Sequence, residues 1–134
     1  AIAKAREWAK ELGLDAVFEV EDAGAEQNSK YDLVIVFYFQ VKQSKLQEVM
    51  RRAAAAVVPG GTLLVVAHDS RNLAEGYSGP QDASVLYSPD DVLSALEGLE
   101  IERAETIERP VEKEGETHIA LDVLVRARAP VLDL

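Results

Sequence analysis

The chain has 134 residues, 48% of them hydrophobic, and its 24 acidic against 14 basic side chains give a formal net charge of −10. This length and composition fit one globular domain, residues 1–134, while the acidic balance argues against nucleic acid as a partner and the absence of Cys excludes disulfides and Cys-ligated metals. No apolar run approaches the roughly 20 residues that span a bilayer, so we expect a cytoplasmic protein with no membrane partner.

The first residues predict an amphipathic helix with one buried face. Apolar residues follow helical spacing from Ile2 through Trp8 to Leu12, and Gly13 is typical of the position after a helix. Because this spacing begins at once, with no capping residue before it, we expect the numbering to start inside a larger fold. The segment from Ala16 to Val20 then predicts a short strand.

The middle of the chain predicts two strands joined by a helix. The unbroken apolar run Leu33 to Phe39 predicts a strand covered on both faces, as in parallel sheets. Ser44 to Val58 has helical spacing, with Ser44 as the N-cap and the turn Pro59–Gly61 ending the helix. Thr62 to Ala67 predicts a second buried strand, which a right-handed crossover would place parallel to the first.

The last part of the chain predicts a long loop, a short helix and a hairpin. Residues His68 to Tyr87 show no periodicity, and loops of this length in compact domains are usually functional or disordered. Ser88 and Pro89 predict the N-cap and first residue of a helix. Leu99–Val111 and Thr117–Ala127 predict an antiparallel pair, in which the Glu-rich first strand suits a sheet edge and the apolar second strand lies deeper.

Three of these features occur together. Tyr31–Val36 puts a Tyr-Asp pair before a buried strand, Pro59–Val65 puts a Pro-Gly-Gly turn before the next, and the chain ends in a hairpin with an inserted last strand. This combination resembles the second half of a class I S-adenosylmethionine-dependent methyltransferase. The tract Gly79–Asp82, followed by Val85–Pro89, is similar to small bacterial methyltransferases of the tellurite-resistance type.

The resemblance implies an α/β fold, with a Rossmann-like, mostly parallel sheet and an antiparallel C-terminal hairpin. The family's Gly-rich loop after its first strand is absent here, because Gly60 and Gly61 precede a strand instead of following one. The chain thus resembles a truncated domain that lacks the first strand-helix-strand. Leu33–Phe39 would then be an open edge, which we expect to be covered by a second copy in a homodimer, by Ala16–Val20, or by residues outside this sequence.

The resemblance also implies S-adenosylmethionine as the cofactor. Asp22 and Ala23 occupy the place where the family contacts the adenine, and Phe37 and Tyr38 would border the transferring methyl group at the carboxyl end of their strand. Each assignment has a simpler alternative. Asp22 can bond its own backbone in a turn, and two of the three aromatic residues at that strand end can belong to the core.

His68 is the candidate catalytic residue, because it ends the second strand at the same sheet edge. With a reference pKa near 6.5, its imidazole could act as general base on an acceptor hydroxyl or thiol, or could simply cap the strand end. Tyr77, Gln81 and Tyr87 lie in or beside the long loop and would border a small-molecule acceptor, unless the loop is only a mobile surface segment. We expect no metal site, since the two His residues lack ligand spacing.

These observations favour a methyltransferase domain that transfers a methyl group from S-adenosylmethionine to a small-molecule acceptor. The alternative is a truncated, non-catalytic remnant that acts as an oligomerisation or partner-binding module through its open sheet edge. A doubly wound nucleotide-binding domain of another kind is a weaker third possibility, because a terminal antiparallel hairpin is unusual in dinucleotide-binding folds.

Overall fold

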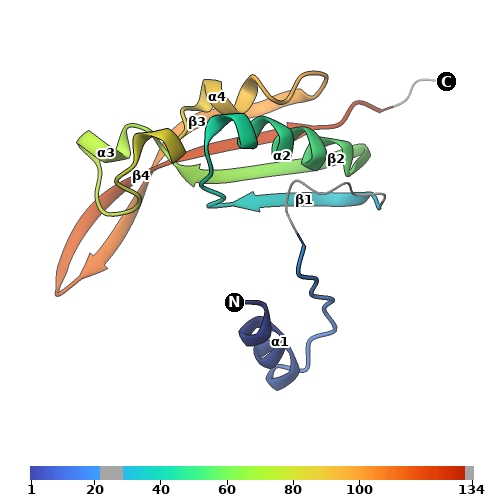
Figure 1. The fold of residues 1–134 in the computed structure, drawn as a ribbon, viewed down its shortest axis with the longest axis horizontal. Coiled ribbons are helices and arrows are strands. Elements are labelled where there is room, and N and C mark those ends of the chain that lie inside the picture. The colour runs from blue at the N-terminus through green and yellow to red at the C-terminus, as the bar shows by residue number, and fades with distance from the viewer. Residues whose placement is uncertain (22–28, 132–134) are drawn as a thin grey trace.

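A single sheet organises the protein, with short helices packed on one of its faces (Figure 1). The computed structural model describes residues 1–21 and 29–131. Its elements are α1 (Ile2–Glu11), β1 (Tyr31–Phe37), α2 (Gln43–Ala55), β2 (Val57–His68), α3 (Asn72–Glu75), α4 (Pro89–Leu93), β3 (Glu100–Lys113) and β4 (Glu116–Arg128), with a 3-10 turn at Ala83–Val85.

The sheet has the mixed arrangement that the sequence predicts. The strand order is β1-β2-β4-β3, in which β1 and β2 are parallel and β4 runs antiparallel to both of its neighbours. The last strand, β4, lies between β2 and β3, and the Glu-rich strand β3 forms an edge of the sheet, as expected. The predicted α/β fold class, with a parallel pair and an antiparallel C-terminal hairpin, is therefore confirmed.

The core lies between the sheet and the helices above it. Alternate side chains of the two inner strands point to this face, as the two-residue period of a strand requires. The buried members from β2, β4 and α2 are Leu63, Val65, Ala67, Val123, Val125, Ala127, Leu46, Val49 and Met50. Both α2 and α4 lie on this same side of the sheet, whereas α1 lies apart from it (Figure 1).

The opposite face of β1 is open, so the prediction that this strand is covered on both faces is wrong. Leu33, Ile35 and Phe37 keep 58%, 52% and 49% of their surface exposed. The unbroken apolar run suits a strand that is covered on both faces, but α2 and α4 cover only one face of the sheet. Among the described residues, β1 is also an unpaired sheet edge.

The N-terminal segment departs from prediction in its packing. The helix α1 forms as expected and is followed by Gly13 with a positive φ of 67°, but Trp8 on its apolar face is 57% exposed. The predicted strand Ala16–Val20 is absent, and Val17 is 85% exposed. A lone strand cannot form without a neighbour for its backbone hydrogen bonds, so this segment does not cover the edge of β1.

Two helix boundaries illustrate what local sequence can and cannot fix. The helix α2 begins after Lys42 rather than Ser44 and ends at Ala55, before the expected limit. The Pro-Gly-Gly turn lies inside β2, where a side chain on Gly61 would meet the Asp32 carbonyl oxygen at 2.9 Å. By contrast, α4 begins as predicted with Ser88 as N-cap, in a capping box with Asp91.

Candidate functional site

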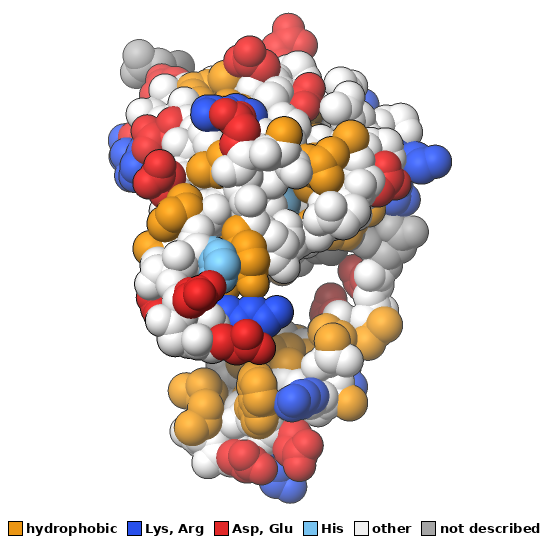
Figure 2. Space-filling model, turned by 90° about the vertical axis from the view of Figure 1, so that its left-hand side faces the viewer, with side chains coloured by type: hydrophobic (Ala, Val, Ile, Leu, Met, Phe, Trp, Pro, Cys, Tyr) orange, Lys and Arg blue, Asp and Glu red, His pale blue; other side chains and the backbone are white. Residues whose placement is uncertain are grey.

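The carboxyl ends of the two parallel strands β1 and β2 lie at the same end of the sheet. The antiparallel strand β4 begins its pairing with β2 at this end. Tyr38 follows β1, His68 ends β2, Arg109 comes from β3 and Asp122 from β4. The register pairs His68 with Asp122 across the sheet. Figure 2 views the molecule from this end, where hydrophobic, acidic and basic side chains are interspersed.

Asp122 is the centre of this cluster. Its side chain is fully buried, on the face of β4 opposite the core residues Val123 and Val125. The Tyr38 hydroxyl donates to Asp122 Oδ2 at 2.7 Å, and Arg109 Nε donates to the same oxygen at 2.7 Å. Arg109 Nη2 lies 3.5 Å from Oδ1. A buried carboxylate of this kind needs such partners, because its desolvation is otherwise costly.

His68 lies against Asp122 without a hydrogen bond to it. Its Nδ1 is 3.8 Å from Asp122 Oδ1 and is a buried atom without a partner. The Tyr38 ring centroid is 4.9 Å from that of His68. Burial lowers the pKa of His68 most, with a further decrease from Arg109 and an opposing increase from Asp122. The imidazole is thus held neutral near pH 7, which suits a proton acceptor.

The lowered pKa of His68 predicts a stability that falls at acid pH. In the unfolded chain the imidazole takes up its proton near the usual value of 6.5, and in the folded protein only at a lower pH. The unfolded state therefore binds more protons in that interval, so the stabilisation is complete above 6.5 and is lost as the pH falls through the folded pKa.

Urea unfolding above and below that interval measures the effect. The variant His68→Gln should lose this part of the pH dependence, whereas His118→Gln should retain it. An unchanged profile in His68→Gln would show that His68 titrates equally in both states.

Tyr38 and Phe37 present aromatic surface at this sheet end. Tyr38 is 41% and Phe37 49% exposed, and Tyr38 adopts a positive φ of 52°, which is uncommon for a residue with a side chain. The Arg109 guanidinium lies 5.6 Å from the Tyr38 ring centroid. Burial, more than the bond to Asp122, raises the pKa of Tyr38, so its hydroxyl stays protonated and donates.

The long loop is tied to the hairpin by a buried amide. Asn72 Oδ1 accepts from the backbone N–H groups of Leu121 at 2.8 Å and Tyr77 at 3.1 Å, while its Nδ2 donates to the Ser78 carbonyl at 2.8 Å. Tyr77 stacks on His118 with ring centroids 4.0 Å apart. The loop is therefore ordered against β4, and Tyr77 lies on the hairpin rather than in the Asp122 cluster.

The structure separates the other predicted acceptor residues. Gln81 is exposed and donates to the Gly79 carbonyl at 3.2 Å. Tyr87 has no exposed surface, and its hydroxyl accepts from Val41 N–H at 2.6 Å, so it has no surface in this structure on which to contact an acceptor. The predicted adenine contacts Asp22 and Ala23 lie outside the described residues.

Two residues of the cluster, Asp122 and Arg109, are not among those that the sequence predicts. A signal for the first was present, because Asp122 interrupts a strand that is otherwise apolar from Ile119 to Val125. A buried position for an acid predicts a paired or functional carboxylate. No comparable signal marks Arg109, which stands among the charged residues of an edge strand.

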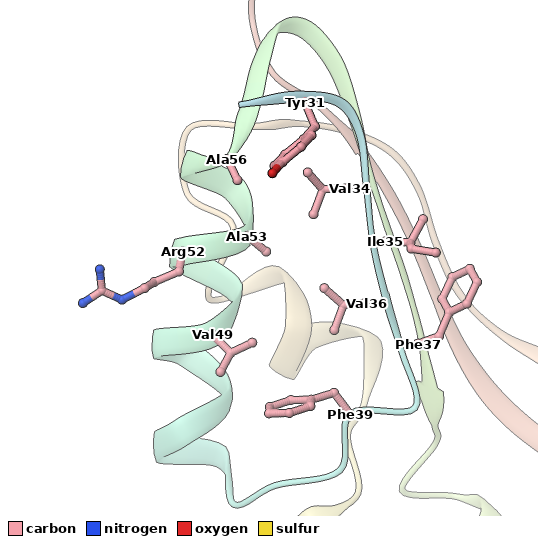
Figure 3. Close-up of a pocket in the computed structure, with 10 residues that line it drawn as sticks. All are labelled: Tyr31, Val34, Ile35, Val36, Phe37, Phe39, Val49, Arg52, Ala53 and Ala56. Atoms are coloured by element: carbon pink, nitrogen blue, oxygen red, sulfur yellow. The ribbon is translucent and has the colours of Figure 1, made fainter. Parts of the chain in front are cut away.

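A separate apolar groove of about 430 Å³ runs between β1 and α2. Val34, Val36 and Phe39 point into it, whereas the Arg52 side chain points away (Figure 3). Ile35 and Phe37 lie on the other side of the strand (Figure 3). The groove offers packing surface without convergent polar groups, so the Asp122 cluster is the better candidate for a functional site.

The described residues show neither a metal cluster nor a membrane-spanning helix. They contain no group of three or more His, Cys, Asp or Glu side chains that could hold a metal ion. In the same part of the chain, no helix combines the length and apolarity that a membrane crossing needs.

Similarity to known proteins is found in structure alone. No family model and no curated protein matches the sequence. A structure from work on the conversion of a disulfide bond into a thioacetal group in echinomycin biosynthesis is 23% identical, with a TM-score of 0.76 over 99% of this chain and 64% of that one. TehB from Haemophilus influenzae is 16% identical, with a TM-score of 0.75 over 96% of this chain and 46% of that one.

A third solved structure is a SAM-dependent methyltransferase from Methanosarcina mazei. It is 16% identical to this chain, with a TM-score of 0.72 over 98% of this chain and 78% of its own. The chain thus spans about two thirds of the first of these neighbours and less than half of the second. These likenesses confirm, at the level of the fold, the resemblance that the sequence predicts.

Proposed function

We propose that the chain, which has the fold of the class I S-adenosylmethionine-dependent methyltransferases, binds S-adenosylmethionine at the carboxyl ends of β1 and β2 and takes part in methyl transfer to a small molecule. The exposed aromatic rings of Phe37 and Tyr38 fit one side of such a cofactor, because aromatic faces attract a sulfonium cation. Asp22 and Ala23 are proposed at the adenine from the sequence resemblance.

The observation that carries this proposal is the meeting of Tyr38, His68, Arg109 and Asp122 at one end of the sheet. In open α/β sheets, ligands bind beyond the carboxyl ends of the parallel strands. The cluster contains a neutral imidazole, a protonated phenol and an ion pair between a buried carboxylate and a half-buried guanidinium. Groups with shifted pKa values at such a position indicate a functional site.

Each side chain has a proposed task. When bound, the cofactor supplies an electrophilic methyl group on its sulfonium. His68 accepts the proton that an acceptor hydroxyl or thiol loses, and Phe37 and Tyr38 form an aromatic wall that excludes water. Tyr77 and Gln81 are proposed near the acceptor from the sequence resemblance alone. Orientation of the two reactants supplies most of the acceleration in such a displacement.

Charge narrows the class of acceptor. The protein carries a net charge of −10, and the guanidinium of the cluster, that of Arg109, is already paired with Asp122 at 2.7 Å. Such a field attracts cations and repels anions, and it leaves the local concentration of neutral molecules nearly unchanged. We therefore propose a neutral or cationic small molecule with an ionisable O–H or S–H group as the acceptor.

Calorimetric titration with S-adenosylhomocysteine, the product form of the cofactor, tests the proposal. We expect micromolar binding by the chain. Tyr38→Leu should weaken the binding of S-adenosylmethionine about 5-fold, since a cation–π contact contributes about 1 kcal/mol. The same variant should weaken the binding of S-adenosylhomocysteine less, because the sulfur of that product is neutral.

Two matched variants control this test. Tyr38→Phe keeps the ring and should bind like the original chain, and Ile101→Ala removes an exposed apolar side chain on β3, away from the cluster. Absence of binding by folded protein would overturn the proposal. A stable dimer in the same sample would then favour the partner-binding module as the alternative.

A further inference from the structure

We propose that Asp122 is a positioning residue for His68. Asp122 accepts a hydrogen bond from Nδ1–H of the neutral imidazole and so leaves Nε2 as the nitrogen that accepts a proton. The role of Nε2 in catalysis rests on the proposed function. The tautomer is a property of this chain alone and can be measured without cofactor or acceptor.

One carboxylate oxygen of Asp122, Oδ1, is free to accept a hydrogen bond from His68. Its Oδ2 already accepts hydrogen bonds from Tyr38 and Arg109, both at 2.7 Å. Its Oδ1 has only the long contact with Arg109 Nη2 at 3.5 Å and faces His68 Nδ1 at 3.8 Å. Hydrogen bonds at functional sites are often long before a ligand binds, and a small ring rotation would close this one.

Electrostatics also favours the Nδ1–H tautomer of His68. In the Nε2–H tautomer, the lone pair of Nδ1 would face the lone pairs of a carboxylate in a buried site, which is repulsive. In the Nδ1–H tautomer, an N–H dipole points at the negative charge instead. The hydrogen bond at one ring nitrogen sets the state of the other, and the low dielectric of a buried site strengthens that preference.

Asp122 and His68 are also held rigidly in place. Asp122 lies on the inner strand β4, in register with His68 on β2 and with Ile107 on β3. Its side chain is 1% exposed, so water does not compete for Oδ1. The imidazole is confined on its loop side too, since a side chain built on Gly79 would come within 3.2 Å of His68 Nδ1.

The groups that face His68 are consistent with a neutral ring. Asp122 from β4 raises its pKa, Arg109 from β3 lowers it, and burial among Tyr38 and the loop around Gly79 lowers it most. The ring is therefore unprotonated near pH 7, the form in which its tautomer decides which nitrogen can accept a proton.

Nitrogen-15 NMR of the imidazole rings reads the tautomer directly, because a nitrogen with a proton and one with a lone pair differ widely in chemical shift. The chain has two histidines, so His118 serves as the internal reference. We expect His68 in the intact chain to carry its proton on Nδ1. A proton on Nε2, with a bare Nδ1, would overturn the proposal even if cofactor binding were found.

The variant Asp122→Asn sharpens the test, because its amide should reverse the tautomer. Tyr38 and Arg109 both donate to the Oδ2 position, so the amide oxygen should occupy it and the NH₂ group should face His68. Nδ1 must then accept, which moves the proton to Nε2. Retention of the Nδ1–H form in this variant would contradict the role of Asp122.

A second variant covers the case in which Asp122→Asn does not fold. Tyr38→Phe removes one donor from Oδ2 and leaves the Oδ1–His68 pair in place, so the Nδ1–H tautomer should persist, and its loss would contradict the proposal. The cofactor titration is independent of these results. Failure to bind S-adenosylhomocysteine with the Nδ1–H form intact would refute the proposed function and not this inference.

Discussion

Replacing Tyr87 by Ala is expected to lower the free energy of unfolding by about 3–5 kcal/mol, as for other large buried aromatic residues. The ring belongs to the core and has no exposed surface. Its hydroxyl accepts from Val41 N–H at 2.6 Å and lies 2.5 Å from the Val41 carbonyl oxygen, to which it can donate. Urea unfolding followed by circular dichroism measures the loss.

A graded pair of variants separates the ring from its hydroxyl. Tyr87→Phe should cost about 1–3 kcal/mol, because it leaves Val41 N–H without its partner. Tyr31→Ala removes a tyrosine that is 51% exposed and should cost far less than Tyr87→Ala. Equal losses at Tyr31 and Tyr87 would contradict the role of Tyr87 as a core anchor.

The placement of Tyr87 also bears on the site. Its hydroxyl holds the backbone of residues 39–41, directly after Tyr38, and Gln40 in this segment accepts from His68 N–H at 2.8 Å. Tyr87 therefore stabilises the turn that follows Tyr38 and that contacts His68 through Gln40.

Asp122→Ala is expected to lower the free energy of unfolding by about 1–3 kcal/mol, since it removes a buried carboxylate that binds a half-buried guanidinium. It leaves the Tyr38 hydroxyl and Arg109 Nε without the oxygen to which both donate at 2.7 Å. The loss should be smaller in Asp122→Asn, which keeps an acceptor. Thermal and urea unfolding of both variants test this order.

Asp32→Ala provides the control, because Asp32 is exposed on the edge strand β1. Exposed substitutions of this kind usually change stability by less than about 0.5 kcal/mol. If Asp122→Ala were as stable as Asp32→Ala, the cluster would contribute nothing to the stability of the fold. That result would contradict the hydrogen bonds that the structure gives to Asp122.

Local patterns in the sequence predict most of the sheet. The apolar runs of β1 and β2 and the turn at Glu114–Gly115 are encoded within a few residues of chain. The capping box of α4 is equally local, since Ser88 and Asp91 satisfy each other's backbone groups. Features of this range are visible without knowledge of the partner elements.

The remaining features depend on residues far apart in the chain. The run at Ala16–Val20 has strand composition but no neighbour to pair with, and the open face of β1 depends on which layer is supplied from elsewhere. The site is non-local in the same way, because Tyr38 and Asp122 are 84 positions apart. The pairing of β1 with β2 and the register of β2 with β4 bring them together.

The edge of β1, which no described residue pairs with, gives the acidic composition a physical consequence for solubility. An extended strand with exposed apolar residues can pair with a like strand of a neighbouring molecule, and such contacts lead to fibres or precipitates. The charge of −10 keeps molecules apart over roughly 8 Å at physiological ionic strength. Colloidal stability of the chain thus depends on its surface repulsion, which added salt removes.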